Sequence, residues 1–303
     1  MSHLPIACVK VTRVSIKGGF KDQLPEETSF LFLEQYFDQK NNKIKEIILS
    51  EEGDEEQVII FEYDDKGKII SEKHHFLFDE IEELTSFSYN DDLLIEKRKE
   101  YSYGSVETTF YTYNEHKLPT SIILRDEDGQ EEESEILTYE GKNLVHYVKK
   151  NALIGKDIEV WMKYDESNQL VEEKRWNHND LKTIITKYDN TKNQDEPDLK
   201  IINEKGAVIE AHIKSFNEKN QLVQHEIQQV NNGLKTLVTS YEYNDLNKIT
   251  FIEAINQDGR TERSLIAHYD DNGLLNAEIK SEYEVAIGTI NTFTLKYEYF
   301  FHQ

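Results

Sequence analysis

Histidines and acids are the side chains of this sequence that could do acid–base or metal chemistry, and two places bring them together. His74 and His75 are adjacent, and His178 stands two residues before Asp180. Adjacent side chains of a strand point to opposite faces, so His74 and His75 cannot readily share one ligand site. The sequence also contains no nucleophile-elbow motif, phosphate-cradling glycine loop or metalloprotease helix motif. We therefore predict no catalytic, cofactor-binding or metal-binding residues, and we expect the protein not to be an enzyme.

Two acid-rich segments could hold calcium through grouped carboxylates: residues 51–56 (EEGDEE) and 126–135 (DEDGQEEESE). An EF-hand loop has its glycine at the sixth position and a glutamate at the twelfth. In the second segment Gly129 comes at the fourth position. The spacing therefore favours solvated hairpin tips, whose charges also discourage aggregation.

Cys8 is the single cysteine, which excludes an intrachain disulfide and a zinc site built on paired thiolates. Residues 1–9 lack the basic start and the apolar run of a secretory signal. No segment reaches the ~18 consecutive apolar residues that a membrane-spanning helix needs. We expect a cytoplasmic protein, or an exported one if a leader was removed.

Aromatic side chains are plentiful, with 17 Tyr, 14 Phe and 2 Trp, and this content predicts a folded chain. Rings exposed on a sheet could stack on sugars, and the candidates for such surface contacts are Tyr111, Trp161 and Trp176. Packing within the protein is the alternative role for the same three rings.

One aromatic position recurs along nearly the whole chain, at separations of 24 to 28 residues. So narrow a period is typical of a repeat protein, and we interpret these aromatic residues as structural anchors. The anchors are Phe37, Tyr63, Tyr89, Tyr113, Tyr139, Tyr164, Tyr188, Phe216, Tyr243 and Tyr269, with Tyr297 as a degenerate last member.

The residues after each anchor predict a chain reversal. Asp or Asn follows most anchors, as at Asp64 and Asp165, and these side chains cap turns by bonding their own backbone. About six residues past the anchor an apolar residue such as Ile69 or Leu170 begins a new strand. A second reversal in each unit is predicted from glycines suited to tight turns, at Gly53, Gly104, Asp128-Gly129, Asn232-Gly233 and Asp258-Gly259.

Before each anchor the side chains alternate with the period of two of a half-buried strand. Ile158, Val160, Met162 and Tyr164 share one face, so the anchor points to the apolar side. The opposite face is mostly charged, although Trp161, Tyr111 and Val238 interrupt it.

The predicted fold is all-β: tandem β-hairpin repeats that form one extended, twisted or spirally curved antiparallel sheet. About ten units would supply roughly twenty strands, and a twist of roughly 20° per strand would prevent a flat sheet. We expect residues 1–30 to cap the first edge and residues 31–303 to form a single continuous repeat domain. Residues 189–207, with Gln194 at an expected apolar position, predict a bulging loop.

Three units, at residues 63–70, 164–171 and 269–275, resemble the YD repeat of the Rhs and teneurin-like families, and the resemblance extends over about residues 37–299. It implies hairpins wound into a spiral sheet, which in Rhs proteins closes into a hollow shell around a toxin segment. Family shells contain many more repeats, and this sequence shows no plug, autocleavage segment or C-terminal toxin domain. The resemblance therefore implies a curved sheet or a partial cradle.

Charge narrows the partner classes. The chain has 35 basic and 59 acidic residues, a formal net charge of −24, which opposes nucleic acid and anionic lipid surfaces as ligands. An acidic surface favours a basic protein partner, and solubility alone is the alternative reason for the charge. We predict a non-enzymatic scaffold that binds or partly encloses a protein partner, such as a toxin, an effector or a secretion-system component. The alternative is a carbohydrate-binding surface or exported module.

Overall fold

The computed structural model describes residues 4–17, 26–191, 193, 195–230, 235–284 and 289–302. Within these residues the regular secondary structure consists of strands alone, which confirms the all-β prediction and its antiparallel hairpins. The chain forms two compact units. The first unit comprises residues 1–86, 101–103 and 239–303, and the second comprises residues 87–100 and 104–238.

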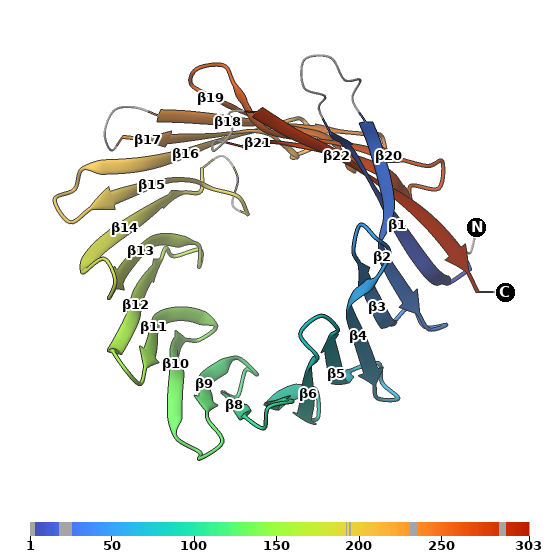
Figure 1. Cartoon of the computed structure of the whole chain (residues 1–303). Coiled ribbons are helices and arrows are strands. Elements are labelled where there is room, and N and C mark those ends of the chain that lie inside the picture. Colours follow the sequence, from blue (N-terminus) through green and yellow to red (C-terminus); the bar gives the residue numbers. More distant parts are fainter. Residues whose placement is uncertain are drawn as a thin grey trace. The chain divides into compact units, whose positions relative to one another are not determined.

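The second unit is a continuous ladder of strands, each antiparallel to the next along the chain (Figure 1). Its strands are β7 (Leu93–Tyr101), β8 (Val106–Tyr113), β9 (Pro119–Arg125), β10 (Glu131–Glu140), β11 (Asn143–Asn151), β12 (Gly155–Tyr164), β13 (Leu170–Asn177), β14 (Lys182–Asp189), β15 (Asp198–Asn203), β16 (Val208–Phe216) and β17 (Leu222–Gln229). The segment 189–207 thus contains a strand, β15, where a loop was expected; Gln194 lies outside the described residues.

The first unit joins the two ends of the chain. Its strands, together with β18, are β1 (Ile6–Lys17), β2 (Glu26–Phe37), β3 (Lys43–Leu49), β4 (Glu55–Tyr63), β5 (Ile69–Phe76), β6 (Ile81–Asn90), β18 (Lys235–Tyr243), β19 (Ile249–Asn256), β20 (Thr261–Tyr269), β21 (Leu275–Glu284) and β22 (Thr289–Phe301). β1 pairs antiparallel with β2 on one side and with β22 on the other. The prediction of an open sheet is therefore corrected at the chain ends, because the first and last strands hydrogen-bond to each other. Residues 1–30 supply β1 and the start of β2.

The turn after most anchors is built by one Asp or Asn side chain. Oδ1 of Asp165 accepts hydrogen bonds from the backbone N–H groups of Ser167 (2.8 Å) and Gln169 (2.9 Å). The residue two positions before the new strand takes a positive φ, which glycine tolerates best; Gly67 has a φ of 82°. At the same position in other turns, Asn168 and Lys117 adopt a φ of 61°. The same pair of bonds to the side-chain oxygen recurs at Asp38, Asp64, Asn114, Asn217, Asn244 and Asp270.

The second set of turns also matches the predicted glycines. Gly53, Gly104, Gly129 and Gly259 all have a positive φ, as tight turns require. The predicted Asn232-Gly233 turn lies outside the described residues.

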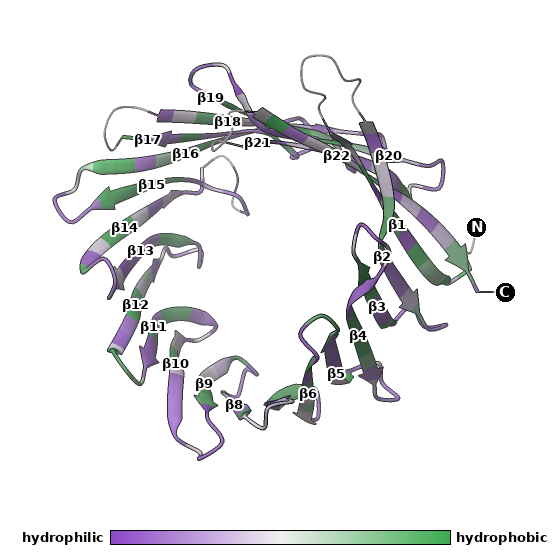
Figure 2. Cartoon of the chain, in the orientation of Figure 1, coloured by the Kyte–Doolittle hydropathy of each residue, from purple (hydrophilic) through white to green (hydrophobic). Residues whose placement is uncertain are grey.

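The sheet has a thin core. Buried apolar side chains cluster on β1, where Val9, Val11 and Val14 lie between β2 and β22. Elsewhere single residues such as Val160 and Ala254 are buried. Among the described residues, no large side chain is completely buried. Figure 2 shows apolar and polar residues mixed along the strands, as expected when neighbours on the same sheet face provide most of the burial.

Candidate functional site

Four anchor tyrosines clamp their units to the unit's own first strand. The hydroxyl of Tyr164 at the end of β12 donates a hydrogen bond to the backbone oxygen of Leu144 at the start of β11, at 3.0 Å. Tyr63, Tyr113 and Tyr269 make the same bond to the backbone oxygens of Lys43, Leu94 and Ile249. Such a repeated bond gives the anchors a structural role, because the hydroxyl that could meet a ligand is already engaged.

In two other units a different side chain makes the corresponding bond. In the last unit Tyr299, and not Tyr297, donates to the backbone oxygen of Leu275, at 2.9 Å. The hydroxyl of Tyr297 instead meets the Glu278 carboxylate at 2.8 Å, and burial followed by this bond raises its pKa. In the seventh unit Nδ2 of Asn190 donates to the backbone oxygen of Leu170 at 3.1 Å. A count of residues between anchors could not have shown either change.

The adjacent histidines His74 and His75 have separate partners. Nδ1 of His74 lies 3.0 Å from Nε2 of Gln57, and its Nε2 meets the Glu72 carboxylate. Nδ1 of His75 lies 2.7 Å from Glu82. His178 packs its ring edgewise on Trp176. In the described part of the chain no three metal-ligating side chains gather around one point.

A histidine pair that sequence reasoning missed lies on β16 and β17. Nδ1 of His212 is 3.0 Å from Nε2 of His225, and Nε2 of His212 is 2.7 Å from the Glu210 carboxylate. Burial, then the charges of His212 and Lys214, lower the pKa of His225. The two positions are 13 residues apart with no local motif, so only the cross-strand register reveals them.

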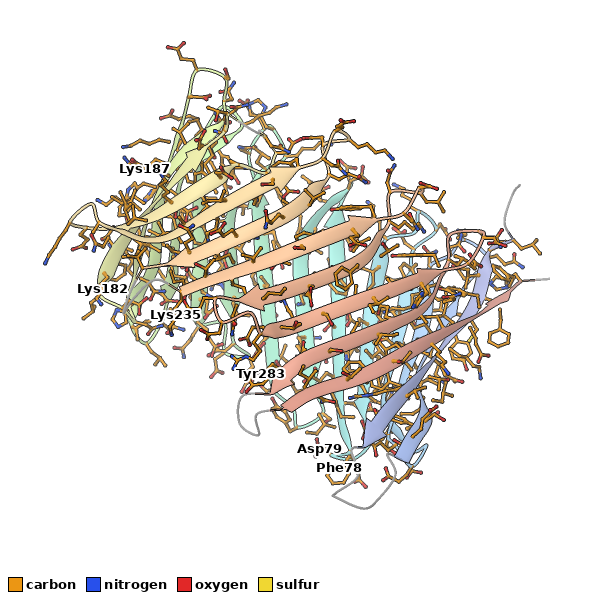
Figure 3. All side chains as sticks on the ribbon, turned by 90° about the horizontal axis from the view of Figure 1, so that it is seen from above. Phe78, Asp79, Lys182, Lys187, Lys235 and Tyr283 are labelled. Carbon is orange, nitrogen blue, oxygen red and sulfur yellow. The ribbon has the colours of Figure 1, made fainter. Side chains whose placement is uncertain are left out.

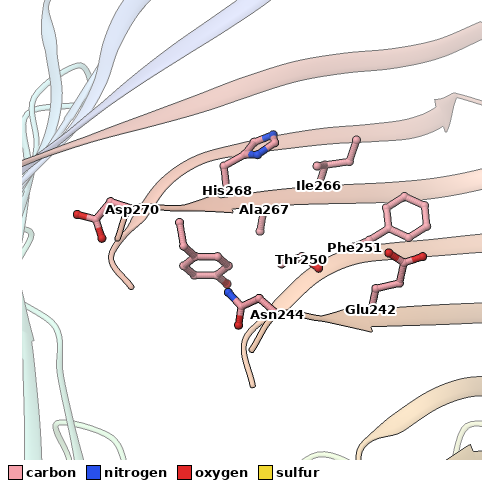
Figure 4. A pocket seen from close by; sticks show the side chains of 9 residues that line it. Glu242, Asn244, Thr250, Phe251, Ile266, Ala267, His268 and Asp270 are labelled. Carbon is pink, nitrogen blue, oxygen red and sulfur yellow. The ribbon is translucent and has the colours of Figure 1, made fainter. Parts of the chain in front are cut away.

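Two hollows indent the strands. One, of about 590 Å³, lies at β18 to β20 in the first unit and is bordered by Glu242, Phe251, Ile266 and His268 (Figure 4). The other, of about 680 Å³, lies at β14 to β17 in the second unit. The buried Ala211 lines it, together with Lys187, Lys200 and Gln228.

A face rich in lysine and tryptophan adjoins this second hollow. It is the side of β11 to β15 opposite the anchors, and we call it the lysine face. Trp161 stands in a cross-strand row between His146 on β11 and Lys174 on β13. The His146 ring stacks on Trp161 at 5.5 Å, and the Lys174 ammonium lies 5.4 Å from the ring centroid of Trp161. The Lys156 ammonium lies 4.8 Å from the Trp176 ring centroid. The lysine face consists of Lys150, Lys156, Lys163, Lys174, Lys187 and Lys200, with Trp161 and Trp176.

The glutamate side chains on the lysine face are less exposed than its lysine side chains. Glu159 pairs with Lys156, and Glu172 pairs with Lys163 at 2.6 Å; these hydrogen bonds lower the pKa of each carboxyl. The side chains of Glu159 and Glu172 are only 14% and 23% exposed. Those of Lys156, Lys163 and Lys187 are 46%, 71% and 58% exposed. These two glutamates are thus neutralised within the sheet, whereas the ammonium groups meet solvent. Asp189, which is exposed, and Asp198, which is half-buried, lie opposite each other on the same face, next to Lys187 and Lys200.

The three aromatic candidates do not lie together. Trp161, 37% exposed, and Trp176 belong to the lysine face. Tyr111 stands two residues before Tyr113 in β8, so it lies on the anchor side and not on the opposite side as expected. Burial raises the pKa of Tyr111. Phe110 is the aromatic residue that β8 exposes on the other side.

The remaining sequence candidates have local roles. In the acid-rich turn at 126–130, Oδ1 of Asp126 accepts the N–H of Gln130 at 2.8 Å, as in the anchor turns. The Glu127 carboxylate reaches the hydroxyl of Ser105 at 2.7 Å. Cys8 is buried in β1, and burial raises the pKa of its thiol. The described residues contain no helix that is long and apolar enough to span a membrane.

Comparison with known proteins finds distant likeness to solved structures. No protein-family model matches the sequence, and no curated protein matches it. A Tc holotoxin pore of Photorhabdus luminescens is 10% identical with a TM-score of 0.41, covering 92% of this chain and 18% of that one. The TcdB2–TccC3–Cdc42 complex gives 14% identity and a TM-score of 0.43, covering 85% and 15%. A porin-like protein of Bacteroides uniformis gives 11% identity and a TM-score of 0.33, covering 98% of both chains.

This chain spans less than a fifth of the length of the two Tc toxin chains. At TM-scores below 0.5, none of these likenesses carries an argument about function.

Proposed function

We propose that the protein is a non-enzymatic scaffold of YD-type hairpin repeats that binds or partly encloses a protein partner. The observation that carries the proposal is that, within a repeat, some side chains hold the hairpin together and others remain accessible to a partner. The anchor tyrosine and the Asp or Asn after it are engaged with the backbone, as at Tyr164 and Asp165. The side chains left for recognition lie on the sheet face opposite the anchors.

The thin sheet supports the same function. Since burial comes mostly from neighbours within one layer, many strand side chains remain at least partly accessible over a large area. Side chains stand along both sides of the strands in Figure 3. A broad surface with modest hollows suits a macromolecule better than a small substrate, which usually binds in a deep apolar pocket. A toxin, an effector or a secretion-system component is the partner class we propose.

Affinity capture from native lysate at low and at high salt, followed by reconstitution with the purified partner, tests the proposal. We expect one protein to be retained stoichiometrically and to resist protease in the complex more than when free. Failure to retain any protein at either salt concentration would refute it. The same lysate passed over a heat-denatured sample of the chain controls for adsorption.

A carbohydrate-binding module is the second candidate, favoured by the partly exposed ring of Trp161 on a sheet face. Glycan-array screening of the wild-type chain with Trp161→Ala and Trp176→Ala tests it. The module predicts glycan binding that either substitution abolishes. Absent binding, or binding that both variants retain, excludes it.

A further inference from the structure

The lysine face is an exception to the acidity of the chain. The net charge is −24, yet this side of β11 to β15 exposes six lysines. Among its carboxylates, those of Glu159, Glu172 and Asp198 are partly buried and that of Asp189 is exposed. Lys150 lies opposite Lys156 across β11 and β12, and Lys187 lies opposite Lys200 across β14 and β15. Like charges directly opposite each other destabilise a sheet. Glu159 beside Lys156 and Glu172 beside Lys187 offset part of this cost, and an approaching anion would offset more.

We infer that the lysine face binds an acidic segment of a protein partner. The inference rests on the proposed scaffold function and names the chemistry of its partner at this surface. Ammonium groups that meet solvent above paired glutamates form a positive surface, and carboxylates are its complement. The lysines lie on five consecutive strands, and strands spaced ~4.8 Å apart give a span of about 19 Å. An extended peptide covers that span with about six residues, at ~3.3 Å per residue.

The tryptophans favour a peptide over a sugar as the occupant. A pyranose stacks on an open indole face, but Lys174 lies over Trp161 and Lys156 lies over Trp176. These contacts hold the ammonium groups in place and leave their remaining N–H donors for carboxylates. Nucleic acid is disfavoured because a long polyanion would also meet the acid-rich turns, whereas a short acidic segment need not.

The adjoining hollow extends the lysine face toward β17. Lys187 and Lys200 line its near side, and the buried Ala211 leaves space between Lys200 and Gln228. Asp189 and Asp198 line it as well, and their carboxylates accept the backbone N–H groups of Thr191 and Lys214, so we place the bound carboxylates on the lysine face outside this hollow. Lys187 is among the residues labelled in Figure 3.

Tryptophan fluorescence tests the inference directly, because the only two tryptophans of the chain belong to the lysine face. The full chain is titrated at low salt with a hexaglutamate peptide, and in parallel with hexalysine, oligogalacturonate and a single-stranded oligonucleotide. We expect hexaglutamate to change the emission saturably and added salt to weaken its binding, with no response to the other three.

A charge-matched pair of variants locates the binding. Lys163→Gln, Lys174→Gln and Lys187→Gln together should weaken hexaglutamate binding roughly tenfold, since an exposed ion pair contributes ~0.2–1 kcal/mol. The control combines Lys66→Gln, Lys142→Gln and Lys219→Gln, which remove the same charge from exposed anchor turns, and it should bind as the wild-type chain does. Circular dichroism of both variants establishes that the strands persist.

Several results would overturn the inference: no response to hexaglutamate, equal weakening in both variants, or preferential binding of the oligogalacturonate or the oligonucleotide. The two proposals fail separately. A partner captured from lysate without hexaglutamate binding would leave the scaffold function standing and remove the lysine face as its acidic-segment site. Hexaglutamate binding without any captured partner would leave the lysine face standing as an acidic-segment site and remove the scaffold function.

Discussion

The bond between an anchor tyrosine and the preceding strand should be measurable by removing one oxygen atom. Tyr164→Phe keeps the ring in place and deletes the hydroxyl that donates to the backbone oxygen of Leu144 at 3.0 Å. A hydrogen bond contributes a net ~0.5–1.5 kcal/mol, and Leu144 is only partly exposed, so water restores the lost bond incompletely. We expect the free energy of unfolding to fall by about 1 kcal/mol and the melting temperature to fall by about 2 °C.

Urea unfolding followed by tryptophan emission suits this test, because Trp161 and Trp176 lie on β12 and β13, beside Tyr164. Tyr103→Phe is the matched control, since Tyr103 is 70% exposed in a turn and should tolerate the change. Joint Phe substitution of the five tyrosines whose bonds are described above (Tyr63, Tyr113, Tyr164, Tyr269 and Tyr299) should cost about 5 kcal/mol, because they stand on strands that do not pair with one another and distant effects add. A Tyr164→Phe unfolding midpoint equal to that of Tyr103→Phe would refute the structural role we assign to the anchors.

Three further predictions follow from other parts of the fold. Lys117→Gly should stabilise the protein by roughly 0.5–1 kcal/mol in the same urea assay, because Lys117 is held at a φ of 61° that a side chain disfavours and glycine accepts. Stability should fall as the pH rises from 10 to 12. In the folded chain the hydrogen bond to Glu34 and burial raise the pKa of Tyr36 to about 12, so the unfolded chain loses this proton first; Tyr36→Phe should flatten the pH profile. Removal of residues 1–17 should produce concentration-dependent aggregation in light scattering, because β2 and β22 would each lose one of their two partner strands and expose an edge; a monodisperse truncated chain would contradict this.

The repeat could be predicted from the sequence because its signals are local. An Asp or Asn that caps its own turn, followed by a residue with a positive φ, fixes the reversal within five residues, as at Asp64 and Gly67. The period of two then fixes which side chains share a face in each strand, as for Val160 and Met162 in β12. The strand in 189–207 was missed because an acid-rich turn precedes it and masks its short apolar run.

Contacts between segments that are distant in the sequence could not be predicted, because no local sequence motif indicates them. The pairing of β1 with β22 joins residues almost a whole chain apart, and no motif in either strand names the other. The row from His146 through Trp161 to Lys174 depends on the register of three strands. Bulges shift that register, for example between Lys149 and Lys150, so a one-residue error in any turn would have placed the rings on different rows.

Net charge proved a poor guide to the candidate surface for a physical reason. A sum over the sequence weighs every acid equally, but a partner meets only the charge that reaches solvent. Glu159 and Glu172 lie low in the sheet, where hydrogen bonds from lysines lower the pKa of each carboxyl and keep it ionised and neutralised. The lysine ammonium groups stand above them on long stems, so this face is positive although the chain is strongly negative. A basic partner would therefore meet its complement at the acid-rich turns, and the lysine face would select an acidic one.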